Sequence, residues 1–391
     1  MRIAYILPDW PEPTIRGYQR IVVERIRRLV CRHEIEVFCF ADDTTDACLS
    51  ELTGICSKVH RVQRNRVYDA LDAIAGVAIG EPAQVAYYRS ARMRQIIAAE
   101  LLDSRFDAVV VQLIRMARYV PANFSGIRLL DMVDPLSLSY ARSVRWRPRW
   151  SRWIYRLEAR RLASYEHRVA DSFDRVLLLS RDELLEYSRT VSLTKLSVVP
   201  YAVDLGHFRL SASKRESGMI VLSGNLGYGP NVEAADLFCR TIFPLVKSAV
   251  PNARLWLVGT NPHPRVRRWD DGETIHVTGH VPDIRPFLQR AMVSVCPVTH
   301  RVGTQTKILE ALAAATPVIA FSETAAGLLP DCAFPVQVAQ TATDFADHVI
   351  RLLNDKNWAI ISAQSRSYVD RRYSWDESTR QFESLLVADP I

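Results

Sequence analysis

The stretch that decides the fold is Gly303-Thr304-Gln305-Thr306-Lys307-Ile308-Leu309-Glu310-Ala311-Leu312-Ala313. A short polar segment that begins with glycine leads directly into a helix with apolar residues at helical spacing. The N–H groups of a first helical turn have no partner within the helix, and the helix dipole is positive there, so this end suits a phosphate. Lys307 adds a positive charge, and the Glu310 carboxylate can accept two hydrogen bonds from a ribose diol. The stretch predicts a nucleotide clamp, although its spacing is equally typical of a capped helix with a solvated face.

A second glycine-rich loop supports the clamp. Residues 219–222 form an apolar run typical of a buried strand, and the loop Gly224-Asn225-Leu226-Gly227-Tyr228-Gly229 follows it. Residues 232–239 then have the pattern of a helix. Ligands of open α/β sheets bind outside the carboxyl ends of strands, where both loops are expected to lie. We therefore expect the two loops to face one phosphate-bearing ligand.

Strand and helix patterns alternate along the chain and predict a parallel α/β layout. The expected strands are residues 2–7, 34–40, 108–112, 128–131, 175–179, 219–222, 254–258, 275–278, 293–297 and 317–321. A polar stretch at 211–218 interrupts the series, so we expect two Rossmann-like domains, at residues 1–205 and 206–374. A helix over 374–387 closes the chain, and we expect the segment 375–391 to cross back to the N-terminal domain.

Four ordered blocks of the second half resemble the GT4-type glycosyltransferases of the GT-B fold, in the sugar-transferase branch associated with bacterial exopolysaccharide synthesis. These blocks are residues 224–231, 258–262, 277–286 and 303–320, with weaker likeness at 131–134, 157–166 and 173–176. The resemblance implies two Rossmann-like domains that face a central cleft. It also implies that the N-terminal domain binds the acceptor and the C-terminal domain binds a nucleotide-sugar donor.

The resemblance implies donor-binding residues in both halves. In the second domain, glycine and basic residues would hold the diphosphate, Glu310 the ribose, and the segment after residue 279 the base. In the first domain, a glycine and an arginine after the first strand would approach the sugar or its phosphate, or else form a turn and a solvated helix start. The implied set is Gly17, Arg20, Gly224, Asn225, His280, Val281, Arg301, Gly303, Thr304, Lys307 and Glu310.

Two departures from the family pattern concern the transferred sugar and the base. The family has a pair of glutamates eight residues apart, but Val302 stands where the first is expected, which leaves the sugar open. His300 and Arg301 either compensate for this loss or are solvated loop residues. The first domain lacks the histidine that many relatives carry after the strand at 108–112. Asp134 is our candidate to orient or deprotonate the acceptor hydroxyl, with an N-cap role as the alternative.

The expected catalytic residues are Lys307, Glu310 and Asp134. Cleavage of the bond to the anomeric carbon places charge on the departing diphosphate, which cations and helix N-termini can stabilise without a metal ion. The Asp-x-Asp motif of the other major glycosyltransferase architecture is missing, and the seven cysteines show no ligand spacing. We expect no metal and no cofactor, the NDP-sugar being a co-substrate. Retention of anomeric configuration is implied by the resemblance alone.

Composition agrees with a protein of two domains. The chain has 391 residues, 48% of them hydrophobic, and a net charge of +7 without a recognised nucleic-acid motif, so we expect no nucleic-acid partner. No signal peptide or clean apolar span is evident, which favours a cytoplasmic location. We expect a possible peripheral association with the inner membrane face.

A row of arginines recurs at helical spacing beside a row of tryptophans, from Arg145 to Arg160. A helix with both rows suits an anionic membrane surface or an anionic acceptor. A tryptophan stripe is more often core, and an arginine stripe is more often a solvated edge.

The function we expect is transfer of a hexose from an NDP-sugar, most readily UDP-linked, to a glycan or lipid-linked saccharide. The alternatives are a natural-product glycosyltransferase and a catalytically silent nucleotide-binding scaffold of a polysaccharide assembly complex. Transfer or hydrolysis of an NDP-sugar would exclude the scaffold.

Overall fold

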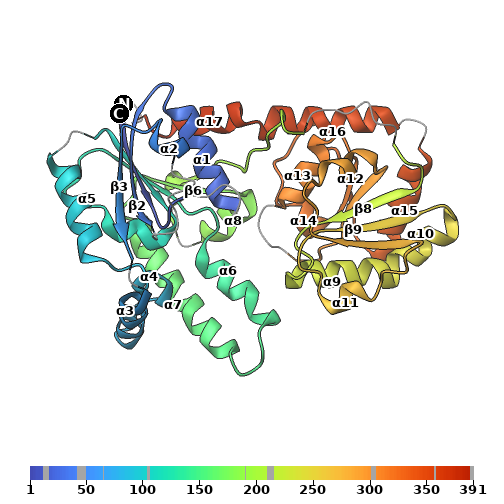
Figure 1. The fold of residues 1–391 in the computed structure, drawn as a ribbon, viewed down its shortest axis with the longest axis horizontal. Helices are drawn as coiled ribbons and strands as arrows, with labels where there is room; N and C mark the ends of the chain where they lie inside the picture. Colours follow the sequence, from blue (N-terminus) through green and yellow to red (C-terminus); the bar gives the residue numbers. More distant parts are fainter. Residues whose placement is uncertain are drawn as a thin grey trace. The chain divides into compact units, whose positions relative to one another are not determined.

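The computed structural model describes residues 1–11, 17–41, 50–64, 66–103, 106–189, 191–208, 215–300, 305–355 and 358–387. The chain forms two compact units (Figure 1). Unit 1 contains Met1–Pro200 and Ser378–Ile391, and unit 2 contains Tyr201–Glu377. Each unit is built around its own parallel sheet.

The sheet of unit 1 has the strand order β3-β2-β1-β4-β5-β6-β7, and each neighbouring pair is parallel. Its central strands are nearly continuous apolar runs because helices cover both faces of a parallel sheet. Strand β4, for example, is buried along its whole length. The strands are β1 (Arg2–Leu7), β2 (Glu34–Ala41), β3 (Lys58–Gln63), β4 (Ala108–Gln112), β5 (Ile127–Asp131), β6 (Arg175–Leu178) and β7 (Leu196–Val198).

Helices of unit 1 bury their apolar sides in two cores. Val22 and Ile26 of α1 belong to the core that contains Tyr5 and Val110. Met93 and Ile97 of α5 belong to the core that contains Ile6 and Val111. The helices are α1 (Gly17–Leu29), α2 (Ser50–Thr53), α3 (Arg66–Ala78), α4 (Ala83–Ala86), α5 (Ala91–Asp103), α6 (Leu136–Ser143), α7 (Arg152–Ala170) and α8 (Arg181–Tyr187), with 3₁₀ turns at Ile114–Tyr119, Val144–Trp146 and Leu193–Lys195.

The sheet of unit 2 has the order β10-β9-β8-β11-β12-β13 and is also parallel. The strands are β8 (Met219–Ser223), β9 (Arg254–Val258), β10 (Ile275–Gly279), β11 (Val293–Cys296), β12 (Val318–Phe321) and β13 (Val336–Ala339). The helices are α9 (Gly229–Leu237), α10 (Phe243–Ala249), α11 (Pro264–Arg267), α12 (Arg285–Arg290), α13 (Thr306–Ala313), α14 (Ser322–Ala325), α15 (Ala342–Asn354) and α16 (Trp358–Tyr373), with a π-helical turn at Phe238–Ile242. Leu257, Val295, Phe238 and Phe345 are among the residues of its core.

All ten strands expected from the sequence are present, and their ends differ by at most one residue. Three further strands, β3, β7 and β13, were not expected. Each of them has exposed or half-buried positions, so none forms the continuous apolar run by which a buried strand is recognised.

The prediction of one helix from Arg145 to Arg160 is wrong. Arg145 lies in the 3₁₀ turn at Val144–Trp146, and α7 begins only at Arg152. Pro148 explains the break, because a proline disfavours the helical conformation of the residue before it. Arg147 is accordingly extended, with φ −92° and ψ 148°. The two arginine groups therefore belong to α7 and to the turn that follows α6.

The last helix, α17 (Trp375–Ser384), begins in unit 2 and continues in unit 1. Phe382 and Leu386 are fully buried in the core of unit 1 beside Ile3 and Tyr5. The guanidinium of Arg25 lies 4.2 Å from the centre of the Phe382 ring, and Arg25 also forms a buried ion pair with Asp131. The segment after Glu377 therefore completes the core of unit 1.

We expect Phe382→Ala to lower the free energy of unfolding of unit 1 by about 3–5 kcal/mol, because it leaves a cavity and removes the ring over Arg25. Chemical denaturation followed by circular dichroism would measure the change. Val387→Ala is the control, since the Val387 side chain is 61% exposed, and it should leave stability nearly unchanged. Equal stability of the Phe382 variant and the wild type would contradict this account of the α17 segment.

Candidate functional site

The strand order of unit 2 reverses direction between β8 and β11, which are neighbours in the sheet. At such a switch point the loops after the two strands diverge and leave a crevice at the carboxyl edge. The glycine-rich loop at 224–228 follows β8, and the segment that leads to α13 follows β11. The two motifs picked out in the sequence therefore meet at one switch point of one sheet.

Lys307 joins the two motifs directly. Its Nζ donates a hydrogen bond of 2.6 Å to Oδ1 of Asn231 on α9. The amide Nδ2 of Asn231 in turn donates to the carbonyl of Asn225, at 2.9 Å. Within the described residues no carboxylate pairs with Lys307 at ion-pair distance, so a neutral amide orients the ammonium group without cancelling its charge. An anion at this edge would meet a positioned positive charge.

The glycine-rich loop lies tightly against the loop that follows β9. Gly224 N donates to the carbonyl of Val258 at 3.0 Å, and Leu226 N donates to that of Thr260 at 2.9 Å. A Cβ on Gly259 would lie 1.6 Å from the carbonyl oxygen of Gly224, so no side chain fits there. Gly224 itself has φ +137°, and a Cβ on it would lie 3.8 Å from Lys307 Nζ. This packing fixes the loop backbone close to the ammonium group.

The structure describes some of the other donor-binding residues predicted for unit 2, and the rest lie outside the described residues. Glu310 lies on α13, one turn after Lys307, and it is half-buried and has an interaction partner. His280 and Val281 follow β10, the edge strand of this sheet, and His280 is exposed. Arg301, Gly303 and Thr304 lie outside the described residues, as does Val302.

His300 has a structural partner that the sequence did not indicate. Its Nε2 lies 3.4 Å from Oε2 of Glu233 on α9, two residues after Asn231. The segment after β11 is thus tied to α9 by His300 and by Lys307. Neither contact could be read from the sequence, because the paired residues are 67 or more positions apart.

In unit 1 the first-domain candidates lie at the carboxyl edge of the sheet. Gly17 is the first residue of α1, after the loop that follows β1, and Arg20 is half-buried one turn later. A polar group missed by sequence reasoning lies nearby: Oδ2 of Asp9 accepts from Tyr18 and Tyr88 at 3.4 and 3.3 Å. Tyr88 also accepts a hydrogen bond of 3.3 Å from Arg115.

Asp134 follows β5 and is exposed. It is not the N-cap of α6, because Pro135 holds that position, and among the described residues no side chain caps it. Near the start of this helix, Glu166 of α7 accepts a 2.9 Å hydrogen bond from Ser137 N. The partner of Asp134 is Glu183, at the start of α8, and a side-chain hydrogen bond joins the two carboxyl groups. Glu183 is 1% exposed. Its burial, together with the charge of Asp134, raises the pKa of Glu183 to about 9. At neutral pH Glu183 therefore keeps its proton and donates it in the hydrogen bond to Asp134.

One group of described side chains has the geometry to hold a metal ion, Glu36, His60 and Glu100 in unit 1. Two cations already compete for its carboxylates, because Arg2 pairs with Glu36 and Lys58 lies 2.6 Å from Glu100. These residues lie near the start of β2 and β3 and on α5, away from the carboxyl edge of the sheet. The group is best described as an ion-pair network of the fold.

Two parallel sheets with helices on both faces, one per unit, define the GT-B fold of glycosyltransferases, and solved structures agree. Sucrose-phosphate synthase from Thermosynechococcus elongatus is 15% identical, with a TM-score of 0.68 and coverage of 98% of both chains. HepE from Anabaena, solved in complex with UDP, is 12% identical with a TM-score of 0.68 over 99% of both chains. WaaG, a glycosyltransferase involved in lipopolysaccharide biosynthesis, is 15% identical with a TM-score of 0.62 over 98% of both chains.

Within this fold, residues 217–355 match the family described as "Glycosyl transferases group 1". The matched segment lies in unit 2 and contains β8, the loop after it, Asn231, Lys307 and Glu310. No curated protein sequence matches the chain. The family match and the fold together support glycosyl transfer as the chemistry of this protein. Among the described helices, none is long and apolar enough to cross a membrane.

We expect Gly259→Ala to destabilise unit 2 strongly and to weaken any ligand binding at the Gly224 loop, because the new Cβ must displace the Gly224 carbonyl. The matched control is Gly272→Ala. Gly272 also has a positive φ, of +71°, but no atom of the described residues lies within 4 Å of its Cβ position. The control should therefore lose only the roughly 1–2 kcal/mol of a left-handed residue. Thermal denaturation measures both, and similar losses in the two variants would show that the close approach is unimportant.

We expect Glu183→Gln to raise stability at alkaline pH. A carboxyl group whose pKa is higher in the folded state than its ordinary value of 4.5 destabilises the fold as pH rises from that value towards about 9, because only the unfolded chain ionises freely. Glutamine cannot ionise, so the variant should melt at a higher temperature than the wild type at pH 8 and at a similar one at pH 4.5. Glu186→Gln, on the same helix, is the control. A wild-type pH profile in the Glu183 variant would contradict the assignment.

Proposed function

We propose that the protein transfers a hexose from an NDP-sugar, UDP-linked, to a glycan or lipid-linked saccharide, with retention of configuration and without a metal ion. The observation that carries the proposal is the ammonium group of Lys307, held by Asn231 beside the Gly224 loop at the switch point of unit 2. This arrangement suits a diphosphate. We favour UDP as the nucleotide of the donor, since HepE, which shares the fold, was solved with UDP and with UDP-glucose.

In the proposed reaction, the bond between the anomeric carbon and the diphosphate oxygen breaks, and the acceptor oxygen forms the new bond to that carbon. Lys307 offsets the negative charge that develops on the departing diphosphate, as do the backbone N–H groups near the start of α13. Glu310 binds the ribose hydroxyl groups. Asp134 accepts the proton of the acceptor hydroxyl, and the hydrogen bond from Glu183 holds its carboxylate in place.

The acceptor side of the proposal places the protein at a membrane face in polysaccharide assembly. Exposed apolar side chains of unit 1 support this: Trp150, Trp153, Ile154 and Leu157 in and before α7, and Val67, Tyr68, Leu71 and Ile74 on α3. Exposed aromatic and aliphatic groups beside arginines are typical of surfaces that dock on anionic lipid. A small natural product as acceptor would favour an apolar pocket instead.

Nucleotide binding tests the donor site. We expect UDP or a UDP-sugar in EDTA to raise the unfolding temperature of the purified protein; at about 100 times its dissociation constant a ligand adds about 2.7 kcal/mol to stability. The shift should be lost in Lys307→Ala and in Glu310→Ala. Lys247→Ala is the control. Lys247 donates to the carbonyl of Ala253, which precedes β9 and so lies at the opposite edge of the sheet, and the variant should leave the shift intact.

The outcomes of this measurement separate the proposal from its rivals. A shift that appears only when Mn²⁺ or Mg²⁺ is added would contradict metal independence. The absence of a shift with every nucleoside diphosphate would refute the donor site. Nucleotide binding without transfer or hydrolysis of any NDP-sugar would favour a scaffold that binds nucleotides.

A further inference from the structure

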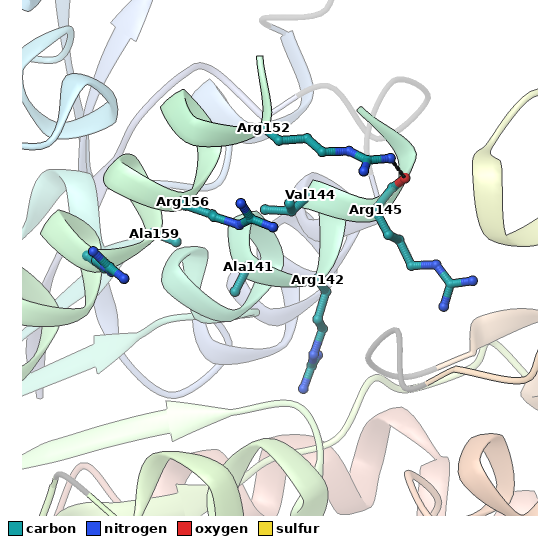
Figure 2. A pocket seen from close by; sticks show the side chains of 8 residues that line it. Ala141, Arg142, Val144, Arg145, Arg152, Arg156 and Ala159 are labelled. Carbon is teal, nitrogen blue, oxygen red and sulfur yellow. Dashed lines mark hydrogen bonds between the residues drawn. The ribbon is translucent and has the colours of Figure 1, made fainter. Parts of the chain in front are cut away.

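A pocket of about 580 Å³ lies in unit 1 between α6 and the start of α7 (Figure 2). Five of its eight lining residues are arginines, and the other three are Ala141, Val144 and Ala159. The arginines are Arg142, Arg145, Arg152, Arg156 and Arg160. Figure 2 shows Arg142 and Arg145 at the end of α6 and its following turn, and Arg152 and Arg156 on the α7 side. Arg160 also belongs to α7. The pocket exists because Pro148 ends the first of these segments and lets α7 fold back.

Among the described residues, Arg142, Arg152, Arg156 and Arg160 together have few acidic partners. Arg142 lies 2.8 Å from Glu186 and 3.9 Å from Glu183. Arg152 donates to the backbone carbonyls of Arg147 and Arg145, at 3.1 and 3.2 Å. Throughout the described ranges, no Asp or Glu lies within ion-pair distance of Arg156 or Arg160, and both are exposed. Positive charge therefore exceeds negative charge in the pocket.

This excess of charge costs stability in the empty protein. Arg152, Arg156 and Arg160 follow one another at i, i+4 along α7, and like charges at this spacing repel each other and weaken the helix. Glu183 gives Arg142 little compensation, because its pKa is raised and it stays protonated at neutral pH. A bound anion with several charges would remove this repulsion. Guanidinium groups bind phosphate with two parallel hydrogen bonds, which arginine offers and lysine does not.

The position of the pocket indicates which anion it takes. Arg142 lines the pocket and also contacts Glu183, the partner of Asp134, so the pocket adjoins the carboxyl pair. On the same helix α7, Trp153 and Ile154 are 63% and 43% exposed and lie beside Arg152 in the chain. A ligand here would meet phosphate-binding groups, an apolar surface and the proposed acceptor base within one unit.

We propose that this pocket binds the diphosphate or phosphate ester of a lipid-linked acceptor, so that the acceptor of the reaction is a saccharide carried on a lipid phosphate. The proposal rests on the function inferred above. It gives unit 1 a specific anchor for the acceptor: the arginines of the pocket bind the phosphate, and the exposed aromatic and aliphatic side chains of α7 contact the lipid. With the phosphate anchored in the pocket, the length of the acceptor between its phosphate and its reacting hydroxyl determines how close that hydroxyl comes to Asp134.

The test measures binding of inorganic pyrophosphate by calorimetry at low salt. The whole protein is used with Lys307→Ala, which removes the proposed diphosphate site of unit 2. We expect Arg156→Gln/Arg160→Gln in this background to weaken pyrophosphate binding by at least about tenfold, since two charge-assisted contacts are lost. The control is Arg161→Gln/Arg168→Gln, which changes the net charge equally on the same helix but outside the pocket. It should bind within about twofold of the background, a loss well below that of a single charge-assisted contact.

A second arm distinguishes the source of the phosphate. Wild type and both double variants are mixed with vesicles of phosphatidylglycerol or of phosphatidylcholine and sedimented. If pyrophosphate does not bind, or binds equally to both double variants, the proposal is overturned. If only phosphatidylglycerol binding depends on Arg156 and Arg160, the pocket serves the membrane headgroups and the acceptor assignment is wrong.

A negative result for the arginine pocket can be distinguished from a negative result for the donor site. Loss of the nucleotide shift concerns Lys307 in unit 2, whereas loss of pyrophosphate binding in the Lys307→Ala background concerns unit 1 alone. Thermal melts of each arginine variant without ligand establish that it is folded. An unchanged or higher melting temperature is expected, because a repulsive pair has been removed.

Discussion

Every strand in both sheets runs parallel to its neighbours, and this constraint determines where chemistry can occur in each unit. Parallel strands need a crossover after each one, so all loops that follow strands gather at a single edge. In unit 2 that edge holds the Gly224 loop and Lys307, and in unit 1 it holds Asp9, Asp134 and Glu183. Reversing any one of the strands that precede these groups would move the group that follows it to the opposite edge.

The two units treat charge differently at this edge. Among its described residues, unit 2 presents the ammonium group of Lys307, oriented by a neutral amide and by glycine loops that bring backbone close to it. Unit 1 contains many more charges, some of them deep: Arg25 and Asp131 form a buried pair, and Glu183 is kept neutral by its surroundings. A buried pair contributes little net stability but is costly to break, which makes it a strong constraint on how α1 and β5 are placed. In unit 2, backbone geometry thus positions the charged group, whereas in unit 1 paired side chains position the charges.

The features that could be predicted from the sequence are those encoded by neighbouring residues, such as strands and short loop motifs. The strands were predictable because buried parallel strands are apolar runs. The approach of the Gly224 loop to Lys307 was predictable because each lies in a short motif that follows a strand. Asn231 could not be assigned as the partner of Lys307, since 76 residues separate them. Glu183 was missed for a similar reason, because its protonation follows from burial that only the tertiary structure creates. The spacing of the arginines is helical, but they do not lie on one helix, because Pro148 holds Arg147 in an extended conformation and so interrupts the helix.

The path of the chain through the two units has a consequence for the order in which the protein folds during synthesis. Unit 2 is a single continuous segment, Tyr201–Glu377, whereas unit 1 needs Phe382 and Leu386 to fill its core. The ribosome releases the chain from the N-terminus, so the first two hundred residues emerge with part of their apolar core uncovered. The half that is made second can therefore reach its final packing first. Until the α17 segment arrives, the nascent unit 1 exposes the apolar site of Phe382, and this interval is when it would most need protection by a chaperone.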